Sequence, residues 1–140
     1  MSHKKQFHED FILLAEAGFI AVNQADEDAA QKLFKAAAIL DPKNPLAQVG
    51  FGYLHLHKLE LKEACACFEN VLEHHPKNEM ARAFLGICVS LMPKNADKGE
   101  KILEETLKSH DPMIKKLSAT AIDFVERFVK RAPGPAEKTK

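Results

Sequence analysis

The feature that most limits how this chain can fold is a repeat of 34 residues. Gly18, Gly52 and Gly86 follow one another at that interval. Three further pairs keep the same spacing: Ala30 and Ala64, Phe34 and Phe68, and Pro42 and Pro76. Because several residue types recur at one period, we expect similar supersecondary units that stack and cover one another's apolar faces.

The residues between the repeated positions indicate helices. Asn44-Pro45 and Asp111-Pro112 are typical of an N-cap followed by proline at the first helical position. Asp26 and Asn78 are further candidate N-caps, each followed by acidic residues that favour a helix start. The two repeated prolines are expected to end the second helix of their units. Since no segment alternates apolar and polar residues, the sequence predicts an all-α fold.

This pattern resembles the tetratricopeptide repeat (TPR), which runs W-x2-L-G-x2-Y, then A-x3-F, then P. The second unit matches with Phe51, Gly52, His55, Ala64, Phe68 and Pro76. The resemblance implies three TPR-type helix-turn-helix units, about 11–44, 45–78 and 79–112, in a short right-handed solenoid. The third unit departs from the pattern, because Gly99 and Leu103 stand near its Ala and Phe positions. In each unit the Gly and the Ala allow close helix approach, and the Phe fills the space between the helices.

Two segments lie outside the three units. Residues 113–131 place apolar side chains at helical spacing and are predicted to form a C-terminal capping helix, with a partner-binding helix as the alternative. Residues 1–131 would then form a single TPR domain, followed by a disordered tail at 132–140. At the other end, Phe7 and Phe11 suggest a short leading turn of helix that packs on the first pair or on a second copy.

Composition limits the classes of partner. The 140 residues contain 20 Lys plus Arg and 20 Asp plus Glu, whereas a general nucleic-acid binder needs a basic excess. The N-terminus lacks the apolar segment of a signal peptide, and the most apolar stretch, 84–92, is about half the length of a membrane-spanning helix. Three cysteines without disulfide-like spacing suit a reducing compartment. We therefore predict a cytoplasmic protein that neither binds nucleic acid nor inserts into a membrane.

The chain has no recognised catalytic or metal-binding motif. Cys65 and Cys67 are two residues apart, which places them on different faces of a helix, and the seven histidines show no ligand spacing. There is no phosphate-binding glycine loop and no nucleophile elbow. The sequence therefore predicts no catalytic residue, no metal site and no cofactor, and a function other than catalysis.

The TPR resemblance implies that the first helix of each unit lines a concave face that binds polypeptides. The positions that correspond to this groove are mostly apolar here. The predicted partner-binding residues are Ile12, Phe19, Leu46, Val49, Tyr53, Leu56, Met80, Phe84, Ile87 and Leu91. An open apolar surface of this kind would promote association, so we expect a protein partner that inserts an apolar helix or extended segment. The alternative is that some of these residues pack against the next unit.

The apolar groove also separates TPR subclasses. Co-chaperones that grip acidic tails use a clamp of Lys, Asn and Arg, whereas the corresponding positions here hold Ala15, Phe19, Gly50, Met80 and Phe84. The chain instead resembles the TPR chaperones of bacterial type III secretion, a virulence system. One branch holds the needle subunit together with a second small chaperone, and the ending of this chain favours that branch. The alternatives are the branch that holds translocator subunits, or a scaffold joining two proteins, and a homodimer in the absence of the partner stays open.

Overall fold

The computed structural model describes residues 3–131, and every regular element in that range is a helix. The predicted all-α fold is therefore confirmed for this part of the chain. Residue contacts divide the molecule into two compact units, Met1–Ala81 and Arg82–Lys140. The predicted disordered tail, 132–140, lies outside the described residues. The assignment to one TPR domain with three repeat units stays a prediction.

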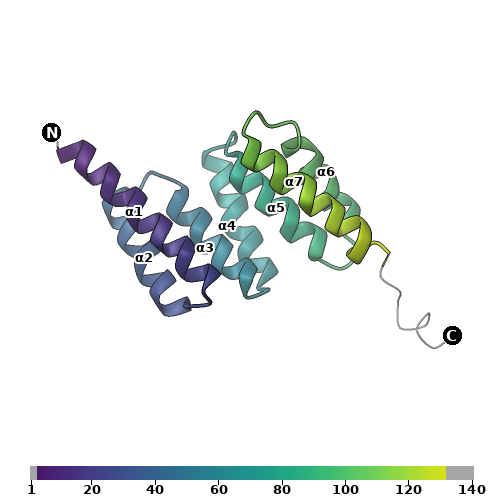
Figure 1. The fold of residues 1–140 in the computed structure, drawn as a ribbon, viewed down its shortest axis with the longest axis horizontal. Helices are drawn as coiled ribbons and strands as arrows, with labels where there is room; N and C mark the ends of the chain where they lie inside the picture. The colour runs from purple at the N-terminus through teal and green to yellow at the C-terminus, as the bar shows by residue number, and fades with distance from the viewer. Residues whose placement is uncertain (1–2, 132–140) are drawn as a thin grey trace. The chain divides into compact units, whose positions relative to one another are not determined.

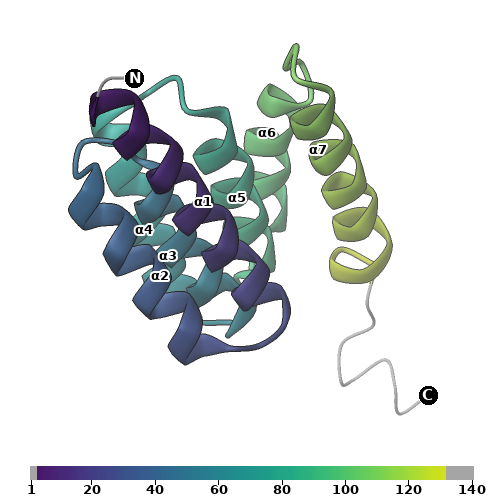
Figure 2. The same cartoon turned by 60° about the vertical axis from the view of Figure 1, so that its left-hand side comes forward.

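Unit 1 contains two antiparallel helix pairs. Its four complete helices are α1 (His3–Asn23), α2 (Glu27–Leu40), α3 (Leu46–His57) and α4 (Leu61–His74). Helix α1 packs on α2 and α3 packs on α4, while α3 also contacts both helices of the first pair. Figures 1 and 2 show α1 running alongside α3. The first helix is continuous from His3, so the expected leading turn is part of α1 itself.

Unit 2 contains most of α5 (Glu79–Leu91), α6 (Ala96–Thr106) and α7 (Pro112–Phe124). A π-helical turn, η1 (Val125–Val129), follows α7 directly. Helix α7 packs on α6, where the buried Oγ1 of Thr106 and Oγ of Ser118 lie 2.6 Å apart in a hydrogen bond. The segment predicted to cap the fold is thus helical, but its last turn widens in a way that the sequence did not indicate.

The repeated glycines and phenylalanines are contact partners. A Cβ added to Gly18 would lie 2.5 Å from Cε1 of Phe34, and one added to Gly52 would lie 2.5 Å from Cε1 of Phe68. Both rings are fully buried. A separation this short does not occur for real Cβ atoms, so any larger residue would push the two helices apart. This contact explains why the same two residue types recur at one interval.

Three of the four predicted N-caps are confirmed, whereas α3 has its N-cap at Pro45 and not at the predicted Asn44, whose Oδ1 accepts from the N–H of Leu46 at 3.0 Å. The backbone N–H of Ala29 donates to Oδ1 of Asp26 at 3.1 Å, and that of Met113 donates to Oδ1 of Asp111 at 2.9 Å. Oδ1 of Asn78 accepts from Ala81 at the start of α5. Each of these bonds satisfies a donor that the first turn of a helix leaves without a partner. The sequence signals therefore locate the helix starts well.

The turns inside the two pairs of unit 1 share a backbone geometry without containing glycine. Ala25 has a φ of 60° and Leu59 a φ of 58°, and the two positions are 34 residues apart. In both turns the next residue donates its N–H to a carbonyl five residues back, Asp26 to Ala21 and Glu60 to His55. This is a Schellman helix end, which usually has glycine at the left-handed position.

Replacement of Leu59 by glycine should stabilise the protein. A side chain at positive φ costs about 1–2 kcal/mol, and the greater freedom of glycine in the unfolded chain offsets part of the gain. Leu59 is 72% exposed, so little packing is lost, and we expect the free energy of unfolding to rise by about 0.5–1 kcal/mol. The measurement is urea unfolding of Leu59→Gly. In the control Ile39→Gly, at a similarly exposed residue in the last turn of α2, stability should fall instead.

Candidate functional site

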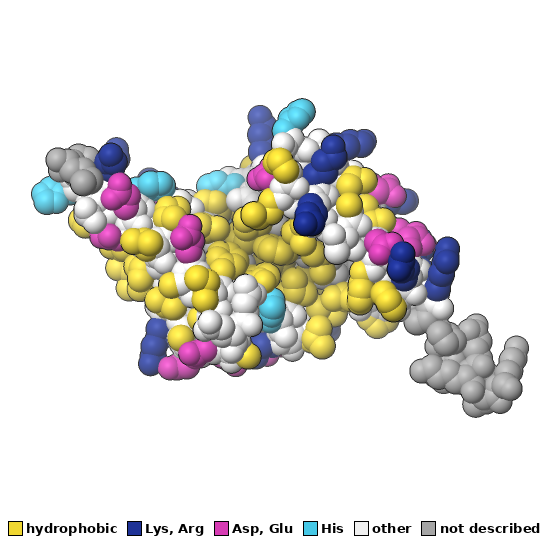
Figure 3. Space-filling view, in the orientation of Figure 1, with side chains coloured by type: hydrophobic (Ala, Val, Ile, Leu, Met, Phe, Trp, Pro, Cys, Tyr) yellow, Lys and Arg dark blue, Asp and Glu magenta, His cyan; other side chains and the backbone are white. Residues whose placement is uncertain are grey.

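Predicted groove residues meet on the side of unit 1 where α1 and α3 run together. Phe19 of α1 and Tyr53 of α3 have ring centroids 5.2 Å apart. Ile12 and Leu46, which precede them by seven residues, both pack against the core cluster that contains Phe11. Figure 3 shows hydrophobic side chains gathered over α1 and α3. We call the partly exposed residues Ile12, Phe19, Leu46, Tyr53 and Leu56 the unit 1 stripe.

Tyr53 combines apolar contacts with polar ones. Its hydroxyl donates to Oδ1 of Asn23 at 2.6 Å, and its ring centroid lies 4.4 Å from that of His57. Phe19 also packs edge-on against the buried Phe34, at 5.3 Å. The stripe is therefore held in place by rings on the core side and by a hydrogen bond at its polar edge. A tyrosine in this setting offers a partner both an apolar face and a hydroxyl group.

Burial raises the pKa of the Tyr53 hydroxyl above its ordinary value near 10. Tyr53 is the only tyrosine and the chain has no tryptophan, so its absorbance reports on this site alone. We expect the folded protein to give a phenolate titration with a midpoint above 10, and the protein unfolded in urea to give the ordinary value. Because the folded-state pKa is raised, the corresponding stabilisation is present below pH 10 and declines as the pH rises through that midpoint. Equal midpoints would show that the ring is solvated.

One predicted groove residue is wrong. Val49 is fully buried, as are Ala15 and Ala83, which occupy the same position one repeat earlier and one repeat later. This position points into the core in each helix, so no partner can reach it. The other nine predicted residues keep part of their surface exposed. A signal for this burial was present in the sequence, because all three positions hold small or β-branched residues.

Unit 2 contains an apolar pocket that the sequence predicted only in part. It has a volume of about 260 Å³. Its lining comes from α5, α7 and the start of η1: Ile87, Leu91, Leu117, Thr120, Ala121, Phe124 and Val125. The two α5 residues belong to the predicted groove, whereas those of α7 were assigned to capping. The spacing of Leu117, Ala121 and Phe124 already indicated one face of a helix. We call this the unit 2 pocket.

The predicted residues thus fall in both units. Phe19 and Tyr53 belong to unit 1, and Phe84 and Ile87 belong to unit 2. Within each unit the structure brings predicted residues onto a common apolar surface. Whether the two surfaces form one continuous groove stays a prediction.

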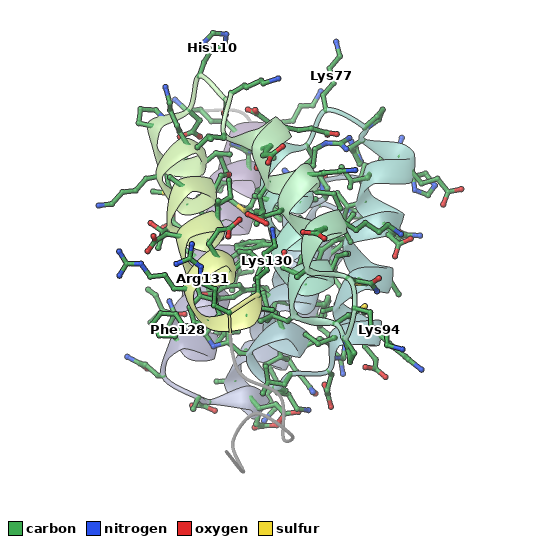
Figure 4. The ribbon with its side chains drawn as sticks, turned by 90° about the vertical axis from the view of Figure 1, so that its right-hand side faces the viewer. Lys77, Lys94, His110, Phe128, Lys130 and Arg131 are labelled. Carbon is green, nitrogen blue, oxygen red and sulfur yellow. The ribbon has the colours of Figure 1, made fainter. Side chains whose placement is uncertain are left out.

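A charged cluster fixes the end of the helix that lines the unit 2 pocket. Nζ of Lys130 lies 2.8 Å from Asp97, 2.7 Å from Glu100 and 3.2 Å from Glu126. Figure 4 shows Lys130 directed over the helices, whereas Lys94 extends away from them. Burial raises the pKa of Glu100, while the hydrogen bond from Lys130 lowers that of Asp97. Because the cluster joins η1 to α6, it holds the pocket-lining end of α7 in place.

The histidine-rich corner of unit 1 carries no metal-binding arrangement. A pocket of about 450 Å³ lies between the α2–α3 loop and the end of α4, where His74 and His75 contribute to its wall. Nδ1 of His74 already donates to the carbonyl of Asn70 at 3.1 Å. Among residues 3–131, no group of three or more His, Cys, Asp or Glu side chains could hold a metal ion. The pocket therefore offers polar and apolar contacts without a ligand set.

The chain shows no match to known protein-family models, curated proteins or solved structures. In the described range, each helix is too short or too polar to cross a bilayer.

Proposed function

We propose that this protein binds another polypeptide and buries an apolar segment of it against the unit 1 stripe and the unit 2 pocket. The observation that carries the proposal is the pairing of Phe19 and Tyr53 at 5.2 Å on a partly exposed face. These rings lie where the resemblance places a TPR groove. Aromatic residues held in a fixed orientation are typical anchors of protein interfaces, since they contribute contact area at a low cost in conformational entropy.

The assignment of the helix pairs to TPR units is part of this proposal. It is supported by the Gly18–Phe34 and Gly52–Phe68 contacts and by the left-handed turns at Ala25 and Leu59, which repeat at the same interval. In unit 2 a Cβ on Gly86 would lie 2.8 Å from Cγ of Leu103, so the residue near the Phe position takes the same role. Three stacked units in a short right-handed solenoid would place the stripe on the inner face.

We further propose that the partner is an export substrate of type III secretion, with the needle subunit as the first candidate. The support is the resemblance, together with apolar residues where co-chaperones of heat-shock proteins carry their clamp. Of those positions, Phe19, Met80 and Phe84 are partly exposed in the structure. A chaperone for a translocator subunit, or a scaffold that joins two proteins, would use the same surface.

Co-purification from the native cell followed by mass spectrometry tests the proposal. If the chain is a chaperone, one small aggregation-prone partner should co-purify with it at a fixed ratio. Co-expression with the chain should then raise the solubility of that partner. Recovery of two folded proteins, each soluble alone, would favour the scaffold instead. If the chain is recovered without any protein at a fixed ratio, the binding proposal fails.

A further inference from the structure

Helix α1 carries an apolar ridge on the side that faces away from its own core. Leu13 and Ile20 are 64% and 56% exposed and lie seven residues apart, on one side of the helix. Their counterparts one repeat later, Ala47 and Leu54, are buried in clusters with residues of α1 and α2. The corresponding surface of α3 is therefore covered by α1 and α2, whereas on α1 this surface is exposed.

The ridge is acidic as well as apolar. Glu9, Asp10 and Glu16 lie within one helical turn of Leu13. Residues 3–81 carry 8 Lys and Arg against 12 Asp and Glu, a net charge of −4. Figure 3 shows acidic side chains among the hydrophobic ones along α1. A surface that covers this ridge should therefore be apolar in the middle and basic at its border.

The unit 2 pocket has those properties. Phe124 of its lining and the neighbouring Phe128 are 47% and 62% exposed, with ring centroids 5.3 Å apart. Lys116 lies one turn before Thr120 of the pocket lining, and Arg127 pairs with Asp123 at 3.1 Å. Residues 82–131 carry 10 Lys and Arg against 7 Asp and Glu, a net charge of +3. The neutral total charge of the chain thus conceals two oppositely charged units.

We propose that the unit 2 pocket binds α1 of a second copy of this chain. Leu13 and Ile20 enter the pocket and contact the Phe124–Phe128 pair, while the carboxylates of α1 face the basic border of α7. The second copy is the occupant because the ridge and the pocket match in both apolar character and charge. An interface made by one helix is small, so a dissociation constant in the ~micromolar range is expected. Association would cover Ile87 and Leu91 when no partner polypeptide (the client) is bound. Self-association does not require that such a client exists.

Sedimentation equilibrium of the purified chain over about 1–200 μM, at low and high salt, tests this proposal directly. We expect the mass to rise with concentration from the 15.6 kDa of one chain, and to rise less at high salt. The double variant Leu13→Ser/Ile20→Ser should stay monomeric, and Phe124→Ser should weaken association by at least about tenfold. All three positions are exposed, so circular dichroism should show unchanged folding.

A charge exchange provides the specific control. Glu9→Lys and Lys116→Glu should each weaken association about fivefold to tenfold, and the double variant should recover most of the loss. Tyr53→Glu, which lies outside both surfaces, should leave self-association unchanged even if it abolishes client binding. A mass of one chain at every concentration, or association that survives Leu13→Ser/Ile20→Ser, overturns the proposal and leaves the ridge to a different polypeptide.

Discussion

Replacement of Phe68 by alanine should lower the free energy of unfolding by about 3–5 kcal/mol. The ring is fully buried and fills the space beside Gly52, where even a Cβ atom would lie 2.5 Å from it. The truncation removes both the apolar contacts of the ring and the support that holds α3 against α4. For a chain of this length, such a loss corresponds to a fall in Tm of about 10 °C or more.

The matched control is Phe7→Ala, the same truncation at an exposed ring of unit 1. It should change the free energy of unfolding by less than about 1 kcal/mol, because little apolar surface returns to water. Urea unfolding followed by circular dichroism measures both variants. If Phe68→Ala melts within a couple of degrees of the parent, the repeat register is misplaced, and the same holds if the two variants lose equal stability.

The sequence predicted most helix starts well because their signals are local. The N-caps at Asp26 and Asn78 depend on one side chain and a backbone N–H three residues away. The recurring Gly and Phe mark contacts between the two helices of a pair, and their common period made those contacts visible. Local chemistry and the repeat therefore determine most of the helix-pair structure.

The left-handed turns could not be predicted in this way. Ala25 and Leu59 have none of the usual residue types for positive φ, so no signal marks them. The geometry follows from how closely the two helices of a pair must approach, which is a property of packing. The π-helical turn at Val125–Val129 is similar, since it accompanies the contacts of Lys130 with α6 and with Glu126. A contact such as that of Lys130 with Glu100, 30 residues away in the chain, leaves no periodic pattern in the sequence.

The candidate site was predicted in part for a related reason. The position of a residue along a helix predicts the side of the helix on which it lies. Whether that residue is buried depends on the neighbouring helix. Val49 has the expected register and is fully buried, whereas Tyr53, one turn later, stays partly exposed. The α7 wall of the unit 2 pocket was assigned to capping, with partner binding as the alternative, because one apolar helix face can both cap a fold and line a pocket.

Replacement of Tyr53 by glutamate should weaken binding of the partner by at least ~2 kcal/mol, or about 30-fold. The new carboxylate would meet an apolar segment in a region from which binding excludes water. Because Tyr53 also contacts Phe19, His57 and Asn23, the variant should lose some stability, about 1–2 kcal/mol, and remain folded. Tyr53→Phe keeps the ring and should retain most of the affinity, which separates the ring from the hydroxyl group.

Pull-down of the co-purified partner, beside a melting curve for each variant, decides between the outcomes. Lys62→Glu, an exposed charge change on α4, should alter neither property, because an isolated surface charge contributes less than about 1 kcal/mol. If folded Tyr53→Glu binds as tightly as the parent, the unit 1 stripe is not the binding surface and the unit 2 pocket becomes the candidate. If Tyr53→Phe and Tyr53→Glu both unfold the protein, Tyr53 belongs to the core. Lost binding by a folded Tyr53→Glu, with Tyr53→Phe intact, is the result that the proposed function requires.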